Sequence, residues 1–209
     1  HPLVLMGFLS YPPPEVSKFQ ACGGVFGEPM EIARCAELDL HVPAWSEIVI
    51  EGEFLAGARE PEGPFGEFTG YFSARSTEHV FRVDCVSMRE GAWFQSIASG
   101  QAGDHRTTSG LLREAEVRNA LRRTIPGLKN VHVPLSGGSA LTAFVSLRQT
   151  RPGEAKHAIA VTMGVDHYLK FVVIVDDDVD VFNESDVLWA LSTRVQADRD
   201  LVIVSGSLG

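Results

Sequence analysis

The segment EGPFGEFTGYF, residues 62–72, holds the side chains best suited to chemistry. Glu62 and Glu67 stand five positions apart, with two glycines and a proline between them. A Gly-Pro pair favours a turn, and Gly66 can adopt a positive φ, so both carboxyl groups can project toward one cavity. Two carboxyl groups that share a site do not ionise together easily, so one keeps its proton near neutral pH and can act as a general acid. The competing interpretation is a solvated surface loop whose glycines only turn the chain.

A run of acidic residues, Asp176-Asp177-Asp178-Val179-Asp180, offers the oxygen ligands that a hard cation prefers. The run follows a continuously apolar stretch and lacks the spacing of a calcium-binding loop. A solvated strand end or a helix-capping turn explains it better, so we predict no metal site.

The seven histidines are scattered, and no two of them have the i, i+4 spacing of a zinc-binding helix. His105 is the best placed for catalysis, because it lies in a polar stretch just before a predicted helix whose start would also suit an anion. An exposed loop histidine without a role is the competing interpretation. Ser136-Gly137-Gly138-Ser139 is interpreted as a hairpin connection rather than a nucleotide-binding loop.

Strands and a few helices must position these groups. In residues 47–55 two isoleucines and Phe54 alternate with glutamates, which predicts a strand with Glu51 and Glu53 on its solvent side. Similar patterns predict strands over residues 36–42, 79–90, 92–99, 130–135, 141–147 and 200–206, and a strand buried on both faces over 171–175. Apolar residues at three-and-four spacing predict helices over 109–123, 153–163 and 184–195.

These elements predict an α+β fold. We expect one domain across residues 1–209, with an antiparallel, barrel-like sheet and the 109–123 helix packed on it. Residues 1–14 end in three consecutive prolines, which cannot continue a helix or a strand ladder, so they form a rigid extended lead-in.

Composition narrows the class of protein. Lys and Arg (18) against Asp and Glu (27) give a net charge of −9, which repels phosphate backbones and argues against nucleic-acid binding. No apolar run is long enough to span a membrane. The three cysteines, Cys22, Cys35 and Cys85, show neither a disulfide framework nor the paired spacing of a zinc site. We therefore expect reduced thiols and a cytoplasmic protein.

Three stretches, taken together and in order, resemble the UbiD-type decarboxylase family: residues 27–54, 62–72 and 171–201. Enzymes of that family use prenylated flavin mononucleotide (prenylated FMN) to remove or add carbon dioxide reversibly on aromatic, heteroaromatic or α,β-unsaturated acids. The resemblance implies that the chain is the family's central domain, a split β-barrel of the flavin-reductase type with flanking helices. It also implies that the acid pair belongs to an Arg–Glu–Glu network.

The resemblance assigns roles to both glutamates. Glu67 matches the acid that protonates the substrate–cofactor adduct after carbon dioxide leaves, and Glu62 matches the acid that orients the arginine. The arginine itself, most cofactor-holding residues and the family's N-terminal and C-terminal domains fall outside this chain. Where the family has a metal-binding glutamate, eleven residues before Pro29, this chain has Lys18. A lysine can meet a phosphate but cannot ligate a metal, so no cofactor-binding residue is assigned.

The resemblance therefore predicts a carboxy-lyase that acts on a small carboxylic acid. We expect it to work with a missing region, a partner subunit or a second copy, because the apolar strands over 171–181 and 200–206 need cover. The chain would then be a piece of a longer enzyme, one subunit of a split enzyme, or a free-standing protein. The alternatives are a UbiD-like subunit or interaction module without flavin chemistry, or a stand-alone domain with altered acid–base chemistry.

Overall fold

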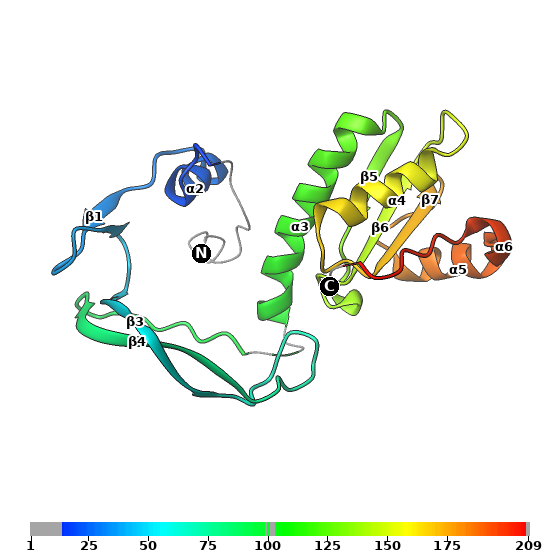
Figure 1. Ribbon diagram of the computed structural model, residues 1–209. Coiled ribbons are helices and arrows are strands. Elements are labelled where there is room, and N and C mark those ends of the chain that lie inside the picture. Colours follow the sequence, from blue (N-terminus) through cyan, green and yellow to red (C-terminus); the bar gives the residue numbers. More distant parts are fainter. Residues whose placement is uncertain (1–13, 99, 101–102, 208–209) are drawn as a thin grey trace. The chain divides into compact units, whose positions relative to one another are not determined.

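A computed structural model describes residues 14–98, 100 and 103–207 (Figure 1). The chain forms two compact units, residues 1–102 and 103–209, where the sequence led us to expect one domain. Each unit is described by itself below. The predicted lead-in, residues 1–14, lies outside the described residues except for Pro14.

The first unit contains one helix and two hairpins. Helix α2 (Lys18–Phe26) begins with a capping box between Ser17 and Gln20 and ends at Gly27 in the left-handed conformation. The hairpins are antiparallel: β1 (Ile32–Arg34) pairs with β2 (His41–Pro43), and β3 (Ile48–Glu62) pairs with β4 (Ser76–Met88).

The turn between β1 and β2 occupies most of the strand predicted over 36–42. The buried carboxylate of Glu51, on β3, accepts hydrogen bonds from the N–H groups of Ala36, Glu37 and Leu38 at 2.8, 2.9 and 2.9 Å. Glu51 is only 3% exposed, so its predicted place on the solvent side is wrong. The bond from Leu38, helped by those from its two neighbours, holds the pKa of Glu51 below its ordinary value, although burial opposes this.

The β3–β4 hairpin carries one apolar face. A register shift after Glu51 leaves Gly52 so close to β4 that a Cβ there would overlap the Arg82 carbonyl oxygen. The pairs Ile50–Val86 before this bulge and Phe54–Phe81 after it lie on the same face, because register partners share a side and Ile50 and Phe54 are an even number of residues apart on β3. We call these exposed residues the apolar hairpin face: Ile50, Phe54, Phe81, Val83, Val86 and Met88.

The second unit is a three-stranded sheet with helices. Its elements are α3 (Gly103–Thr124), β5 (Leu128–His132), η1 (Leu135–Gly137), β6 (Thr142–Leu147), α4 (Glu154–Val165), β7 (Phe171–Asp176), α5 (Glu184–Arg194) and α6 (Ala197–Asp200). The strand order is β5-β6-β7, with β5 antiparallel to β6 and β7 parallel to it. Parallel strands need a crossover connection, which α4 supplies.

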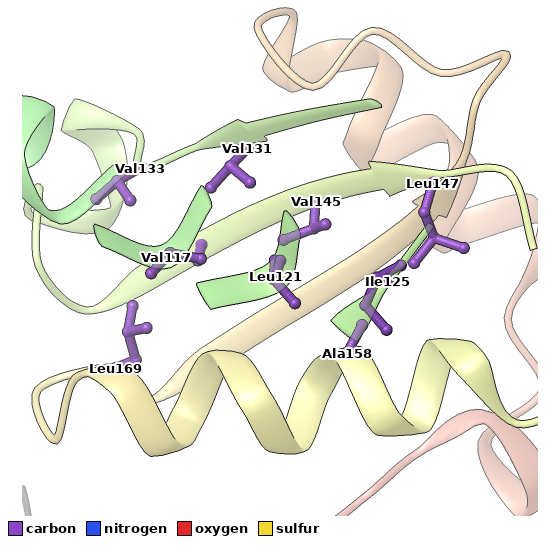
Figure 2. Close-up of a cluster of buried hydrophobic side chains, with 10 residues drawn as sticks. Val117, Leu121, Ile125, Val131, Val133, Val145, Leu147, Ala158 and Leu169 are labelled. Carbon is purple, nitrogen blue, oxygen red and sulfur yellow. The ribbon is translucent and has the colours of Figure 1, made fainter. Parts of the chain in front are cut away.

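A hydrophobic core holds this second unit together (Figure 2). Val117 and Leu121 of α3 pack against Val145 of β6 and Ala158 of α4, and all four are fully buried. An ion pair between Arg113 of α3 and Asp166, which follows α4, adds a polar link between the two helices. Burial lowers the pKa of Arg113, because desolvation disfavours its charged form.

Several sequence predictions need correction. Helix α3 begins six residues before the predicted start at Ser109 and packs on β5, η1 and α4 rather than on a barrel. Residues 92–98 and 201–204 are not strands. Strand β7 is half-buried along its middle, and Phe171 is 69% exposed, so it is not buried on both faces. The predicted hairpin around Ser136–Ser139, helix 153–163 and helix 184–195 are confirmed as β5–β6, α4 and α5.

The predicted α+β class is confirmed, but a closed barrel is not seen. Within the described ranges the strands form three small sheets of two, two and three strands. The hairpin β3–β4 exposes its apolar face, and within the described ranges no third strand pairs with its edges. None of the helices in the described part of the chain has the length and apolar character needed to cross a membrane.

Candidate active site

The acid pair lies at the end of the long hairpin. Glu62 is the last residue of β3 and faces Ser76, the first residue of β4, while Glu67 lies in the connecting loop. Gly63 has a φ of 77°, which a side chain would disfavour. A Cβ there would also meet the Ala74 carbonyl oxygen at 3.0 Å. The turn therefore requires glycine directly after Glu62.

The loop folds back on itself as a small hairpin. Gly66 pairs with Phe72 in an isolated antiparallel bridge, so the positive φ expected at Gly66 is wrong. Gly70 takes that role at the tip, with a φ of 84°. The Glu67 N–H donates to the Tyr71 carbonyl at 2.9 Å, and the Gly70 N–H donates to the Glu67 carbonyl at 2.9 Å. These bonds fix the backbone that carries Glu67.

The two glutamates have different surroundings. Glu62 is exposed, whereas Glu67 is half-buried and its Oε2 accepts a hydrogen bond from the Phe68 N–H at 3.4 Å. That their carboxyl groups approach each other at one cavity stays a prediction. The loop also presents three large rings to solvent: Phe65, Tyr71 and Phe72 are 45%, 78% and 79% exposed. An acid beside exposed aromatic surfaces can donate a proton to a planar organic ligand.

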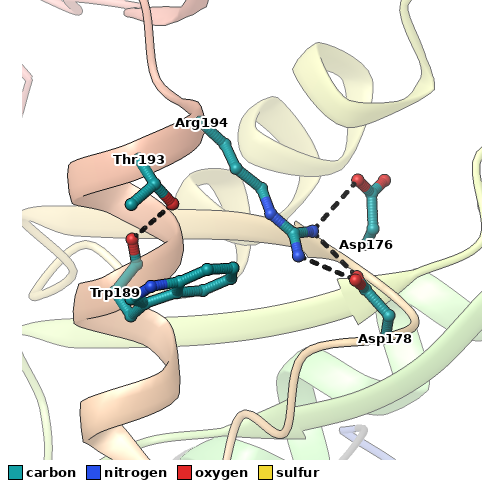
Figure 3. Close-up of polar contacts among 5 residues, drawn as sticks. All are labelled: Asp176, Asp178, Trp189, Thr193 and Arg194. Carbon is teal, nitrogen blue, oxygen red and sulfur yellow. Dashed lines mark hydrogen bonds and ion pairs between the residues drawn. The ribbon is translucent and has the colours of Figure 1, made fainter.

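Three carboxylates of the acidic run at the end of β7 bind arginines, and Figure 3 shows the contacts of Asp176 and Asp178 with Arg194. Arg194 of α5 makes two hydrogen bonds to Asp178, at 2.9 and 2.8 Å, and an ion pair with Asp176 at 3.8 Å. Its guanidinium also lies over the Trp189 ring, 5.1 Å from the centroid. The bonds from Arg194 hold the pKa of Asp178 below its ordinary value. Asp177 pairs with Arg148 at 2.7 Å.

The remaining two candidate residues lie on helices. His105 lies in the first turn of α3, not in a loop, and its N–H donates to the Asp104 side chain at 2.9 Å. Lys18 is the first residue of α2 and is exposed. Within the described ranges, no cluster of three His, Cys, Asp or Glu residues could hold a metal ion.

Two side chains that hold loops in place have no signal in the sequence: Ser73 in the first unit and Glu114 in the second. Ser73 holds the loop of Glu67 through the residue eight positions before it, Phe65, which no local pattern reveals. Glu114 of α3 accepts from the Val133 N–H at 3.0 Å and contacts Nδ1 of His132 at 2.9 Å, which ties α3 to the end of β5. Val133 is a buried residue directly after β5, between a histidine and a proline, and this pattern gives no sequence signal for such a link.

A flavin cofactor fits the described residues in part. The apolar hairpin face and the exposed rings offer surfaces of the kind on which a planar ring system rests. The phosphate group of a flavin mononucleotide binds to cationic side chains or to a bound metal ion, and the described residues provide no metal cluster. The described residues thus suit the ring system of such a cofactor, and no phosphate-holding residue is assigned among them.

Two family models match the chain. The 3-octaprenyl-4-hydroxybenzoate carboxy-lyase Rift-related domain matches residues 1–102, and the C-terminal domain of the same carboxy-lyase matches residues 106–209. The boundary between the two matches coincides with the boundary between the two compact units. The expectation that the chain is the central domain alone, with the family's C-terminal domain outside it, is therefore wrong, because residues 106–209 match that C-terminal domain.

Solved structures similar to this chain include enzymes of the same carboxy-lyase class. The UbiD-class enzyme HmfF from Pelotomaculum thermopropionicum, in an evolved dimeric form in complex with prFMN, is 34% identical with a TM-score of 0.93, over 99% of this chain and 48% of that one. The 3,4-dihydroxybenzoic acid decarboxylase AroY of Klebsiella pneumoniae is 30% identical with a TM-score of 0.82, over 95% and 43%. The vanillic acid decarboxylase of Sedimentibacter hydroxybenzoicus in its open form is 29% identical with a TM-score of 0.83, over 96% and 44%. The chain spans less than half the length of these proteins.

Proposed function

The chain belongs to the UbiD family, and we propose that it supplies the catalytic acid of a carboxy-lyase. The reaction would be the reversible, non-oxidative decarboxylation of an aromatic or α,β-unsaturated carboxylic acid. The observation that supports it best is the placement of Glu67: a half-buried acid on a hydrogen-bonded loop among exposed aromatic rings. The similar decarboxylases act on aromatic acids, which agrees with this class of substrate.

The proposed chemistry needs a proton at the carbon that loses its carboxylate. Prenylated FMN, when bound, supplies the electron sink that makes loss of carbon dioxide possible. Glu67 would then donate its proton to that carbon, and Glu62 would orient the arginine of the Arg–Glu–Glu network. In the reverse direction Glu67 would remove the same proton as a general base. The complex of HmfF with prFMN supports the choice of cofactor.

We propose that the β3–β4 hairpin is part of a split β-barrel. The support is the apolar hairpin face, in which Phe54 and Met88 are 69% and 68% exposed. A two-stranded ribbon is marginally stable by itself, and a large exposed apolar face marks a contact with further structure. The strands that cover it would come from another part of a longer polypeptide, from a partner chain or from a second copy. We use the term completed assembly for the chain together with whichever of these three supplies the covering strands.

The proposed location is the cytoplasm. Cys22, Cys35 and Cys85 are all free, as expected for a reducing compartment. Burial raises the pKa of Cys22 and Cys35, which makes both thiols less reactive at neutral pH.

The test is the loss of one proton donor in the completed assembly loaded with prenylated FMN. Glu67→Gln keeps shape and hydrogen bonding but removes the transferable proton, so the rate of carbon dioxide release should fall by about 10²–10⁴. Glu62→Gln should cost less, because its role is orientation. Glu60→Gln is the matched control, since Glu60 is an exposed glutamate of the same strand that faces Glu78. Unchanged turnover with Glu67→Gln would show that the assigned mechanism is wrong.

A further inference from the structure

Ser73 makes two hydrogen bonds to a single residue of the acid-bearing loop. Its N–H donates to the Phe65 carbonyl at 2.8 Å, and its Oγ accepts from the Phe65 N–H at 3.1 Å. In a regular antiparallel pair the second bond would go to the backbone carbonyl of Ser73. Here the hydroxyl takes that place, so the pairing of residue 65 with residue 73 depends on the side chain.

The same hydroxyl lies beside the turn that follows Glu62. A Cβ at Gly63 would come within 3.1 Å of Ser73 Oγ, so the hydroxyl occupies the space that Gly63 leaves free. Ser73 thus contacts the chain one residue after Glu62 and again two residues before Glu67. Two further contacts follow along the small hairpin. Gly66 pairs with Phe72, and the Glu67 N–H then donates to the Tyr71 carbonyl, so the backbone of Glu67 is joined to the pairing that Ser73 begins.

We propose that Ser73 is a positioning residue for proton transfer by Glu67. This inference rests on the proposed function, because it gives Ser73 a role only if Glu67 is the proton donor. Without the hydroxyl, the Phe65 N–H loses its acceptor and the loop between Gly63 and Glu67 is held by fewer bonds. Glu67 then spends less time at the reacting carbon. A misplacement of about 1 Å can cost up to about a hundredfold in rate without contact to the substrate.

The experiment uses the completed assembly loaded with prenylated FMN and compares three variants. Ser73→Ala should lower kcat about ten- to a hundredfold and leave KM within about twofold. Ser73→Thr keeps the hydroxyl and should restore most of kcat. Ser87→Ala removes a hydroxyl from the end of β4 far from the acid-bearing loop, where Ser87 faces Val49, and serves as the control for loss of a serine hydroxyl elsewhere in the hairpin. An unchanged kcat for Ser73→Ala, or a Thr variant as slow as the Ala variant, would overturn the proposal.

Two further measurements separate the possible failures. If Glu67→Gln keeps full activity, the proposed function fails; if Glu67→Gln is inactive and Ser73→Ala is not, only the role of Ser73 fails. Amide hydrogen exchange on the unmutated assembly covers the case in which Ser73→Ala does not fold. The Phe65 amide should exchange slowly, because Ser73 Oγ accepts its hydrogen bond. Free exchange of that amide would contradict the inference without any substitution.

Discussion

The two units of the chain differ in how they bury apolar side chains. In residues 103–209, a core that includes Val117, Leu121 and Val145 is fully buried. In the described part of residues 1–102, Cys22 is the only buried hydrophobic side chain, and most large apolar residues of β3 and β4 face solvent. Within its described residues, the unit with the candidate catalytic acid therefore shows no hydrophobic core of its own.

This difference indicates that the two units have different roles, one as a stable domain and the other as the carrier of the candidate acid. The second unit has the layered sheet and helices that a small domain needs to fold alone. The first unit presents an apolar face and an acid pair, and both need a covering surface before they can exclude water from a reaction. One further segment or chain that packs on the first unit would cover its apolar face and also complete the surroundings of the acid pair.

The largest expected effect comes from separating the units. Residues 103–209 expressed alone should unfold in one cooperative thermal transition, because their core is internal. Residues 1–102 expressed alone should show no cooperative transition, because little apolar surface is removed from water. Circular dichroism during heating measures both. A cooperative transition in the isolated 1–102 segment would show that this unit is stable by itself and would contradict the difference between the two units.

A smaller effect compares one truncation in each unit. Leu121→Ala should lower the free energy of unfolding by about 2–5 kcal/mol, since its side chain is fully buried. Phe54→Ala in the chain alone should change it by no more than about 0.5 kcal/mol, because the ring is mostly exposed. In the completed assembly the Phe54 substitution should cost about 3 kcal/mol. Urea unfolding gives all three values, and equal costs in the chain alone would contradict the account.

The smallest effect is a pH dependence within the first unit. Three backbone hydrogen bonds lower the pKa of Glu51 in the folded state, so the unfolded state binds the proton first as the pH falls. The stability that Glu51 contributes is present above its ordinary pKa and is lost as the pH falls below about 4, through the lower folded value. Protection of the Ala36, Glu37 and Leu38 amides, measured as the ratio of the intrinsic to the observed exchange rate at each pH, should therefore fall with acid. Glu51→Gln should remove this dependence, whereas Glu53→Gln, which changes an exposed glutamate, should keep it.

The sequence predicted the parts of the fold that local patterns determine. Helices α4 and α5 were found from their apolar spacing and strands β5 and β6 from their alternation, because these signals lie within each segment. The β1–β2 turn was missed, since Glu51 satisfies its N–H groups from more than ten residues away. The segment 201–204 has strand-forming residues but no partner strand within the described ranges, so propensity alone did not decide it.

The candidate site was also predicted only in part. Glycine and proline between two glutamates pointed to a built turn, and Gly63 confirms the need for glycine there. The sequence assigned the positive φ to Gly66 instead of Gly70, because either glycine could close the loop. Ser73 was missed because its partner is a backbone N–H in another part of the loop, and a serine there has no spacing that marks it.

The most direct test of the account is an ultraviolet–visible titration with prenylated FMN, followed by measurement of carbon dioxide release from an aromatic or unsaturated acid. The chain alone and the completed assembly are titrated side by side. We expect the assembly to bind the cofactor and to release carbon dioxide. The chain alone should do neither, because its apolar hairpin face is uncovered and its described residues provide no metal cluster for a phosphate. Stoichiometric cofactor binding and turnover by the chain alone would contradict it.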